Sequence, residues 1–412
     1  MANVPKLNIL MCGAGEYTTG CTGSGASQSY KKVGVVGLTC FDLRRLGKVD
    51  QLSMVGVNEV PRHPSPLEDK IGKVYKDMDV GFKSYPDDNT VDPDSYKKAI
   101  DDLAPGSAVI IFTPNTTHHP IAKYALQRKM HVLVTKPATK LLEHHQELIA
   151  LAQQNGVTCW VKHHKRYGPA YADAKLCARA LGEFNLFQAR MSQPKSQLGT
   201  FRAWAGKDSG VSRITFPLTT STFTPGTSRA SPSQPATGIA TSEPYNCVEE
   251  TKDTITLMVD WQSIANPKHE GPVAYSASWT APLKAGIHSA QYFHYLGQTG
   301  EIRIDQAHRG YYVTEDASGK SAYNPFYMKY SPPETGYFDG QRGYGYVSID
   351  KFVDAARSIN AGASKASDYD GHGLPTIKNT VLTTAILNAG RISLDEKREV
   401  KIERDGENWK LV

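Results

Sequence analysis

The chain has 412 residues, of which 40% are hydrophobic and 21% are charged, a balance typical of a folded globular protein. Its 47 basic and 41 acidic side chains give a formal charge of +6 without a dense Lys/Arg block, so no nucleic-acid partner is expected. Apolar stretches stay shorter than the roughly 18 residues of a membrane span, and the first one breaks at Gly13, so we predict neither a membrane span nor a signal peptide, and a cytoplasmic location.

Short apolar runs alternate with amphipathic stretches through the first 165 residues. The expected strands are residues 7–11, 52–57, 108–112, 131–134 and 157–161, and the expected helices are residues 33–46, 97–103, 119–128 and 141–155. This alternation predicts an α/β fold, with a parallel sheet covered by helices on both faces. Ligands bind at the carboxyl ends of such strands, so the strand-end residues are the candidates for chemistry.

The pattern changes near residue 185, where strands follow one another without intervening helices. They are expected at residues 254–261, 273–280, 291–295 and 301–304, followed by helices at 346–360 and 376–392 and a strand at 400–404. This order predicts a second α/β domain with an open, mostly antiparallel sheet. Such a sheet would expose an apolar face if it were left uncovered, so we expect a homo-oligomer formed through that face.

Residues 209–242 differ in composition from the rest of the chain. Of these 34 residues, 22 are Ser, Thr, Pro or Gly, and the segment contains no acidic residue, lysine or histidine. Such a composition predicts a loop or a disordered stretch.

The run Gly13-Ala14-Gly15-Glu16-Tyr17-Thr18 directly follows the first expected strand. A glycine at 13 permits a tight turn, and a glycine at 15 lets the backbone approach a pyrophosphate, although the third position of this fingerprint is Thr18. We therefore predict a dinucleotide site that includes Gly13, Gly15, Glu16 and Tyr17. The alternative is a glycine turn that binds no ligand.

Cofactor preference is predicted from the end of the second strand. Asn58 is neutral there, and Arg62 and His63 follow, which favours the 2′-phosphate of NADP. Glu59 argues in the opposite direction. We predict NADPH, and NADH stays open.

Cationic side chains follow two later strands at the same sheet edge. Lys136 lies between the strand 131–134 and Pro137, where its ammonium would hold and polarise a substrate hydroxyl or carbonyl. The next strand ends in Lys-His-His-Lys-Arg-Tyr at residues 162–167. We predict that His163, Lys165, Arg166 and Tyr167 bind an anionic substrate, because a guanidinium matches a carboxylate bidentately. The alternatives are a surface lysine and a solvated turn. No metal-ligand spacing occurs, so no metal is expected.

These motifs together resemble the glucose-fructose oxidoreductase/inositol dehydrogenase (Gfo/Idh/MocA) family. The resemblance rests on the glycine turn, on Thr113-Pro114-Asn115-x-x-His118, and on Thr135-Lys136-Pro137. It implies a Rossmann dinucleotide-binding domain at residues 1–165 and a domain for substrate binding and oligomerisation at 166–412. It also implies that Thr113, Pro114, Asn115, His118, Lys136 and Pro137 contribute to the cofactor site.

Longer strings resemble a fungal branch of this family that contains D-galacturonate and D-glucuronate reductases. They include residues 15–20, 163–167, 191–195, 249–257, 324–330 and 343–348. This resemblance implies NAD(P)H-dependent reduction of the C1 aldehyde of a uronic acid, of the D-galacturonate to L-galactonate type, in carbohydrate catabolism. Lys136 would then be the catalytic residue that orients the substrate, and Arg166 or Lys165 would bind the C6 carboxylate.

The chain departs from this family where the resemblance implies an Asp and a His on a helix of the second domain, the His giving the proton to the carbonyl oxygen. That place holds residues 213–225, and no residue of 209–242 is a conventional general acid. We hypothesise a shifted reading frame or a mis-spliced intron, which sequencing the transcript tests. The alternative function is a catalytically weak, cofactor-binding sensor or regulator of sugar metabolism, recognised by cofactor binding without turnover.

Overall fold

Two compact units form the chain in the computed structural model. It describes residues 4–22, 25–26, 33–57, 66–87, 90–196, 198, 228–231, 238–247, 252–263, 266–283, 286, 289–307, 311–316, 319–322 and 324–412. The first unit comprises Met1–Thr139, Glu143–Gly168 and Pro325–Thr380, and the second comprises Lys140–Leu142, Pro169–Asn324 and Val381–Val412. The sequence predicted two continuous domains, whereas residues 325–380 return to the first unit.

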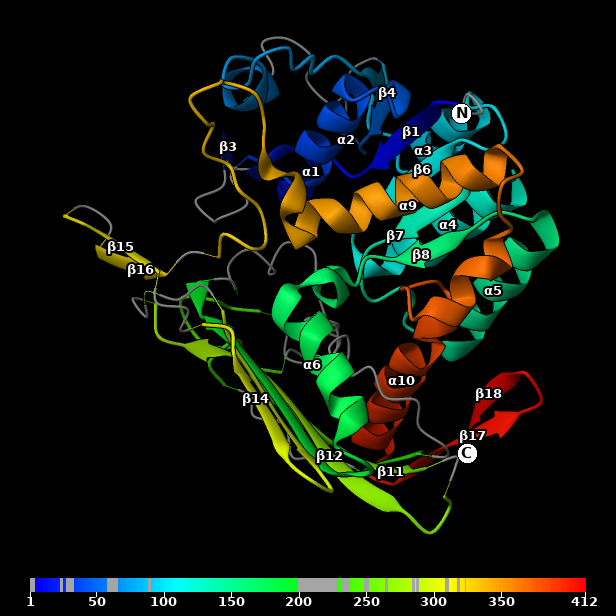
Figure 1. The fold of residues 1–412 in the computed structure, drawn as a ribbon, viewed down its shortest axis with the longest axis vertical. Coiled ribbons are helices and arrows are strands. Elements are labelled where there is room, and N and C mark those ends of the chain that lie inside the picture. The colour runs from blue at the N-terminus through cyan, green and yellow to red at the C-terminus, as the bar shows by residue number, and fades with distance from the viewer. Residues whose placement is uncertain are drawn as a thin grey trace. The chain divides into compact units, whose positions relative to one another are not determined.

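The first unit contains the predicted parallel sheet, whose α/β character is confirmed (Figure 1). Its strand order is β5-β4-β1-β6-β7-β8. The bounds are β1 Leu7–Cys12, β4 Val49–Val55, β5 Lys83–Tyr85, β6 Ala108–Ile111, β7 His131–Val134 and β8 Cys159–Val161. This is the order of a doubly wound dinucleotide-binding sheet, in which the order of strand addition reverses between the parallel strands β1 and β6 and ligands bind at the carboxyl ends of those strands.

Alternate residues of β1 enter two different cores. Leu7, Ile9 and Met11 pack with helices α2 (Val36–Arg45) and α9 (Tyr344–Asn360). Leu10 and Cys12 face α3 (Ser95–Asp101), α4 (His118–Gln127) and α5 (Leu142–Asn155). Burial on both faces explains why the strands read as continuous apolar runs in the sequence.

Short elements connect the strands and helices of this unit. They are α1 (Glu16–Thr19), β2 (Cys21–Thr22), β3 (Gly25–Ala26), η1 (Glu68–Gly72), η2 (Asn115–Thr117), η3 (His164–Tyr167), η5 (Gly340–Arg342), η6 (Ala366–His372) and η7 (Lys378–Thr380). The helix expected from residue 376 begins later, as α10 (Val381–Glu396). None of the described helices has the length and hydropathy that crossing a bilayer requires.

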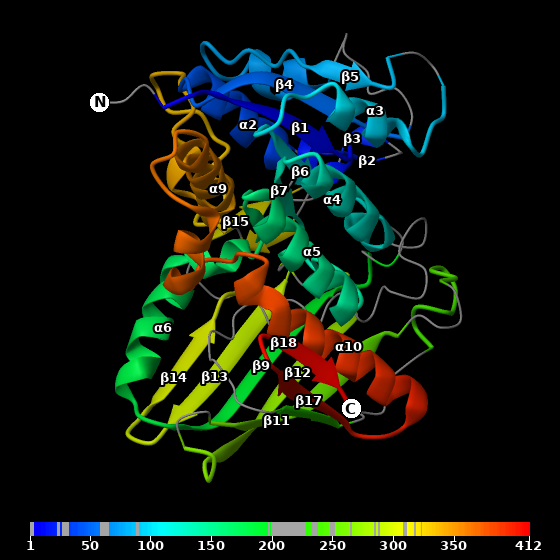
Figure 2. The same ribbon diagram turned by 90° about the vertical axis from the view of Figure 1, so that its right-hand side faces the viewer.

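The second unit is built on an eight-stranded sheet in the order β14-β13-β9-β12-β11-β10-β17-β18 (Figure 2). The bounds are β9 Phe184–Pro194, β10 Ser228–Ser231, β11 Thr254–Gln262, β12 Glu270–Ala281, β13 Ala290–Gly297, β14 Glu301–Asp305, β17 Val400–Asp405 and β18 Asn408–Leu411, with a separate hairpin of β15 Tyr312–Glu315 and β16 Gly319–Ala322. β9 and β12 run parallel, and the other neighbouring pairs are antiparallel. The predicted mostly antiparallel sheet is therefore confirmed.

The apolar face of this sheet is covered by α10 and by α6 (Pro169–Ala180). A Cβ on Gly390 of α10 would lie 3.0 Å from Leu257, and the ring of Tyr171 in α6 lies 5.6 Å from that of Phe293. On the opposite face, the hydroxyl of Thr254 pairs with that of Ser278 at 2.8 Å. The two helices therefore cover the apolar face of the described strands, and the homo-oligomer stays a prediction.

Part of the Ser/Thr/Pro-rich segment forms a strand, although the sequence predicted a loop. β10 pairs antiparallel with β11 and with β17 and so joins the C-terminal hairpin to the sheet. Residues 228–231 contain neither proline nor glycine, so every backbone N–H can enter the ladder. Residues 209–227 and 232–237 lie outside the described residues.

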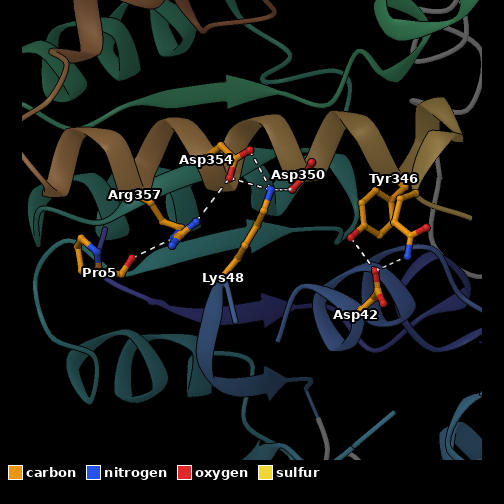
Figure 3. Close-up of polar contacts among 8 residues, drawn as sticks. Pro5, Asp42, Lys48, Tyr346, Asp350, Asp354 and Arg357 are labelled. Carbon is orange, nitrogen blue, oxygen red and sulfur yellow. Dashed lines mark hydrogen bonds and ion pairs between the residues drawn. The ribbon is translucent and has the colours of Figure 1, made fainter. Parts of the chain in front are cut away.

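Polar contacts hold α9 against the first strands and explain why residues 325–380 belong to the first unit (Figure 3). The ammonium of Lys48 contacts Asp350 at 2.5 Å and Asp354 at 2.9 Å. The buried carboxylate of Asp42 accepts a hydrogen bond of 2.8 Å from the Tyr346 hydroxyl.

We predict that Asp42→Ala lowers the free energy of unfolding by about 3 kcal/mol, because it removes a buried carboxylate that is bonded to both Arg45 and Tyr346. Chemical denaturation measures the loss. Asp69→Ala is the matched control, since Asp69 pairs with Lys73 on the surface and should contribute much less to stability. Equal losses in the two variants would contradict the prediction.

Candidate functional site

Gly13 allows the ends of the neighbouring strands β1 and β6 to approach each other closely. Its φ is +98°, and an added Cβ would lie 2.3 Å from the carbonyl oxygen of Phe112, which follows β6. The Gly13 N–H donates to the carbonyl of Val55 at the end of β4, at 2.8 Å. Both the positive φ and the close approach exclude a side chain here.

Gly15 has a different role, because its φ of −77° is accessible to any residue. An added Cβ would meet no atom of the described residues within 4 Å. The predicted neighbours Glu16 and Tyr17 begin α1, and the ring of Tyr17 lies 5.6 Å from that of Phe112. A glycine that faces open space at this strand end fits a ligand that approaches the backbone closely, as a pyrophosphate does.

In the usual fingerprint, a third glycine lets the helix pack closely on the strand. Here two glycines, one in α2 and one just before it, allow similarly close packing. Added Cβ atoms on Gly34 and Gly37 would lie 2.4 Å and 2.5 Å from the carbonyl oxygen of Thr18. The Val35 N–H donates to the carbonyl of Tyr17 at 2.7 Å. Sequence reasoning examined position 18 and missed these glycines, although the run Gly-Val-Val-Gly at 34–37 was the available signal.

His118 links the turns that follow β6 and β7. Nδ1 lies 2.7 Å from the carbonyl oxygen of Pro137, and Nε2 lies 2.9 Å from that of Thr113. Burial lowers the pKa of this fully buried imidazole. Both nitrogens face protein carbonyls, so the ring connects the two turns, and its contribution to a cofactor site stays a prediction.

The other residues predicted after β6 and β7 lie on those two turns. Thr113 accepts a hydrogen bond of 2.7 Å from the hydroxyl of Thr117, and Asn115 begins η2. Pro114 is exposed and Pro137 is buried. Their contact with a cofactor stays a prediction.

Lys136 lies close to the imidazoles of the neighbouring strand end. It is half-buried, and its positive charge contributes to the lowered pKa of His118, His163 and His164. The structure therefore brings Lys136 together with residues 163–167, as expected for neighbouring strand ends of a parallel sheet.

The turn after β8 is buried, so the alternative of a solvated turn does not describe it. His163 is 2% exposed and Lys165 is 4% exposed. Burial, followed by the charge of Arg166, holds the pKa of His163 well below its ordinary value, so the imidazole is neutral at pH 7. Burial lowers the pKa of Arg166 to about 10, and its Nη1 donates to the carbonyls of Gly373 and Leu374 at 3.2 Å and 3.3 Å.

Three polar atoms of this turn are buried without a hydrogen-bond partner among the described residues. They are Nδ1 of His163, Nε of Arg166 and the hydroxyl of Tyr167. Buried polar groups are paired in the large majority of cases, so three such atoms within five residues require an explanation. A bound polar ligand would supply the missing partners.

Sequence reasoning missed two residues of the same strand end. The Lys162 ammonium donates to the carbonyl of Gly345 at 2.7 Å, and the side chain is 3% exposed. The imidazole of His164 lies 5.5 Å from the ring of Tyr344 and 5.3 Å from that of Tyr327. The run Gly-Tyr-Gly-Tyr at 343–346 was noted only as part of a resemblance.

Asn58, the residue on which cofactor preference was predicted, lies outside the described residues, as does most of the segment that lacks a general acid. Within the described ranges, His, Cys, Asp and Glu side chains do not gather in groups of three that could ligate a metal ion.

Comparison with known proteins shows that part of the chain is similar to oxidoreductases. Residues 31–163 match the Gfo/Idh/MocA model, described as an oxidoreductase family with an NAD-binding Rossmann fold. The chain is 36% identical over 106 residues to the oxidoreductase YdgJ of Escherichia coli, covering 25% of this chain and 31% of the relative. It is 40% identical over 68 residues to scyllo-inositol 2-dehydrogenase (NAD(+)) of Bacillus subtilis, covering 16% and 20%. These alignments thus span at most a third of each relative.

Solved structures extend the similarity of fold to nearly the whole chain. GenD2 from gentamicin A biosynthesis, solved in complex with NAD, has a TM-score of 0.60 at 17% identity, with 97% of both chains covered. Myo-inositol 2-dehydrogenase from Lactobacillus plantarum has a TM-score of 0.59 at 13% identity, covering 96% of this chain and 99% of that one. The fold is therefore a Rossmann domain joined to a second α/β domain with a mixed sheet.

We predict that Gly15→Ala leaves the melting temperature unchanged but weakens NADPH or NADH binding about ten-fold or more. Its Cβ meets no described protein atom and would instead occupy the space that a dinucleotide approaches. Fluorescence titration measures the affinity. Gly371→Ala is the matched control, because its Cβ also meets nothing within 4 Å but lies on η6. Unchanged affinity in Gly15→Ala would show that the cofactor does not approach this glycine turn.

Proposed function

We propose that this protein is an NAD(P)H-dependent oxidoreductase of the Gfo/Idh/MocA family that reduces the C1 aldehyde of a uronic acid. The observation that carries the proposal is the set of three buried, unpartnered polar atoms on the turn after β8, next to Lys136. Two of them, Nε of Arg166 and the hydroxyl of Tyr167, are hydrogen-bond donors. A carboxylate accepts hydrogen bonds from both kinds of donor.

The electrostatics of the turn favour an anionic substrate over a neutral sugar. The charges that lower the pKa of His163 and His164 come from lysine, arginine and histidine side chains, including Lys136 and Arg166. Within the described residues, no carboxylate contributes to the pKa of Arg166. A substrate carboxylate would bring negative charge into this positive environment.

Each residue then has a role set by its position. Gly13 and Gly15 would hold the pyrophosphate of the dinucleotide, and its nicotinamide would supply a hydride to the carbonyl carbon. The Lys136 ammonium would donate a hydrogen bond to the carbonyl oxygen and stabilise the negative charge that develops there, and a proton from solvent would complete the alcohol. Arg166 and Tyr167 hold the carboxylate and so orient the aldehyde. The neutral His163 accepts or donates one hydrogen bond at Nδ1, according to its tautomer.

The cofactor is proposed to be NADPH, on the basis of Asn58, Arg62 and His63 in the sequence. The name of the Bacillus subtilis relative specifies NAD(+), so NADH is the alternative to be measured beside it.

One sequence feature favours the second candidate, a cofactor-binding sensor or regulator of sugar metabolism. Residues 209–242 contain no acid, lysine or histidine to serve as the proton donor. A protein without that donor would keep the cofactor site and the cationic turn but turn over slowly, since general acid catalysis typically contributes about 10²–10⁴-fold in rate.

We predict that the purified protein oxidises NADPH when D-galacturonate is added. Lys136→Met should lower kcat by about 100-fold or more, because the hydrogen bond to the developing alkoxide is lost. Arg166→Leu should raise the KM for galacturonate about 100-fold, as expected for a charge-assisted pair, with little effect on D-galactose, which has no carboxylate.

Lys98→Met is the matched control, because Lys98 is exposed and lies 3.8 Å from Asp87, away from these strand ends. NADPH binding without oxidation would favour the sensor. An equal effect of Arg166→Leu on galacturonate and galactose would contradict the assignment of the carboxylate site.

A further inference from the structure

Lys162 is a buried cation that the proposed reaction does not use. Its pKa is lowered to about 7 by burial. The ammonium contacts the Gly345 carbonyl and lies 5.9 Å from the centre of the Phe112 ring. The thiol of Cys40, whose own pKa is raised to about 12 by burial, is neutral at pH 7, and the other ionisable neighbour is the His164 imidazole, whose pKa the charge of Lys162 helps to lower.

Such a residue costs stability. A buried ammonium without a charged partner is less favourable than an apolar side chain of similar volume. Among the described residues, its hydrogen bond is the one to Gly345, at the start of α9. Lys162 therefore acts on the structure through the first turn of α9.

Close backbone contacts fix the first turn of α9. The N–H groups of Tyr344 and Gly345 donate to the carbonyls of Phe326 and Tyr327 at 2.8 Å and 2.9 Å. An added Cβ on Gly343 would lie 2.5 Å from the Tyr327 carbonyl oxygen. The helix start and the turn at residues 325–327 are therefore held together as one body, and Lys162 joins that body to the end of β8.

This body contacts the turn after β8, residues 163–167, through aromatic rings. The ring of Tyr344 is stacked on the His164 imidazole with 10° between the planes, and the Tyr327 ring approaches it at 53°. His164 is 9% exposed and begins the turn that contains Arg166 and Tyr167.

We propose that Lys162 is a positioning residue for the substrate site: by holding the Gly345 carbonyl, it keeps Tyr344 and Tyr327 against His164 and so fixes the turn that binds the anionic substrate. This inference rests on the proposed function, because it assigns substrate binding to that turn. Lys162 acts through Gly345 and Tyr344 and does not itself contact the substrate.

Two substitutions separate the hydrogen bond from the charge. Lys162→Met removes both, whereas Lys162→Gln keeps an N–H donor for the Gly345 carbonyl. We expect Lys162→Met to raise the KM for D-galacturonate roughly ten-fold, which is the loss of about one hydrogen bond, with unchanged affinity for NADPH. Lys162→Gln should retain most of the parent affinity. Tyr344→Leu should reproduce the effect of Lys162→Met, and the double variant should be no worse than either single one.

Lys162→Met should raise the melting temperature although it weakens substrate binding. The folded pKa of about 7 is below the ordinary value of 10.5, so between these pH values the unfolded state binds more protons and stability rises with pH. Lys162→Met removes the cost of burying the charge. Its gain in melting temperature over the parent should be largest below about pH 7 and should shrink towards pH 10.5. A merely structural lysine would lose stability and activity together.

Histidine side-chain NMR spectra of the whole protein provide a readout that does not need turnover. The His164 imidazole signals should shift in Lys162→Met and stay near the parent positions in Lys162→Gln. If the parent protein fails to reduce galacturonate but this pattern holds, the proposed function fails and the positioning contact stands. An unchanged His164 signal in Lys162→Met, or equal damage to substrate affinity by Met and Gln, would overturn the inference.

Discussion

The packing of α9 on the parallel sheet is the interaction on which the candidate site depends. The buried residues of α9 pack in the same core as alternate residues of β1. Asp42 bonds to Tyr346 of this helix, and Lys48 bonds to Asp350. The first turn then meets the end of β8 through Lys162 and His164. A helix from a distant part of the sequence thus completes the environment of a turn that precedes it by some 180 residues.

The cations at this strand end are stabilised by few compensating charges. Burial depresses the pKa of Lys162, of Arg166 and of both imidazoles, which means that the folded protein carries an unfavourable electrostatic cost there. Such a cost persists in proteins mainly where it is part of function. If this turn binds a carboxylate as proposed, that negative charge would reduce the cost, so part of the binding free energy is already present in the free protein.

Local patterns determined what could be predicted from the sequence. Strands β6 and β7 are short apolar runs that end in turn residues, so their positions and the place of Lys136 at the sheet edge followed directly. The roles of Gly34 and Gly37 did not, because they depend on the carbonyl of Thr18 across a helix contact. The return of α9 to the first unit also escaped prediction, since an amphipathic helix shows that it has a partner but not which one.

The unusual composition of segment 209–242 is compatible with an intact sheet but provides no side chain that could serve the substrate as a conventional general acid. Strand β10 lies within it and needs only backbone N–H and C=O groups to pair with β11 and β17, so almost any residues other than proline serve. Near the end of the segment, the N–H groups of Ile239 and Ala240 donate hydrogen bonds of 2.8 Å and 2.6 Å to the carboxylate of Asp253. A replaced stretch of sequence can therefore leave the sheet intact. What it cannot replace is a side chain that titrates near pH 7, so any loss from such a change falls on the chemical step and leaves the strand-end sites of the first unit in place.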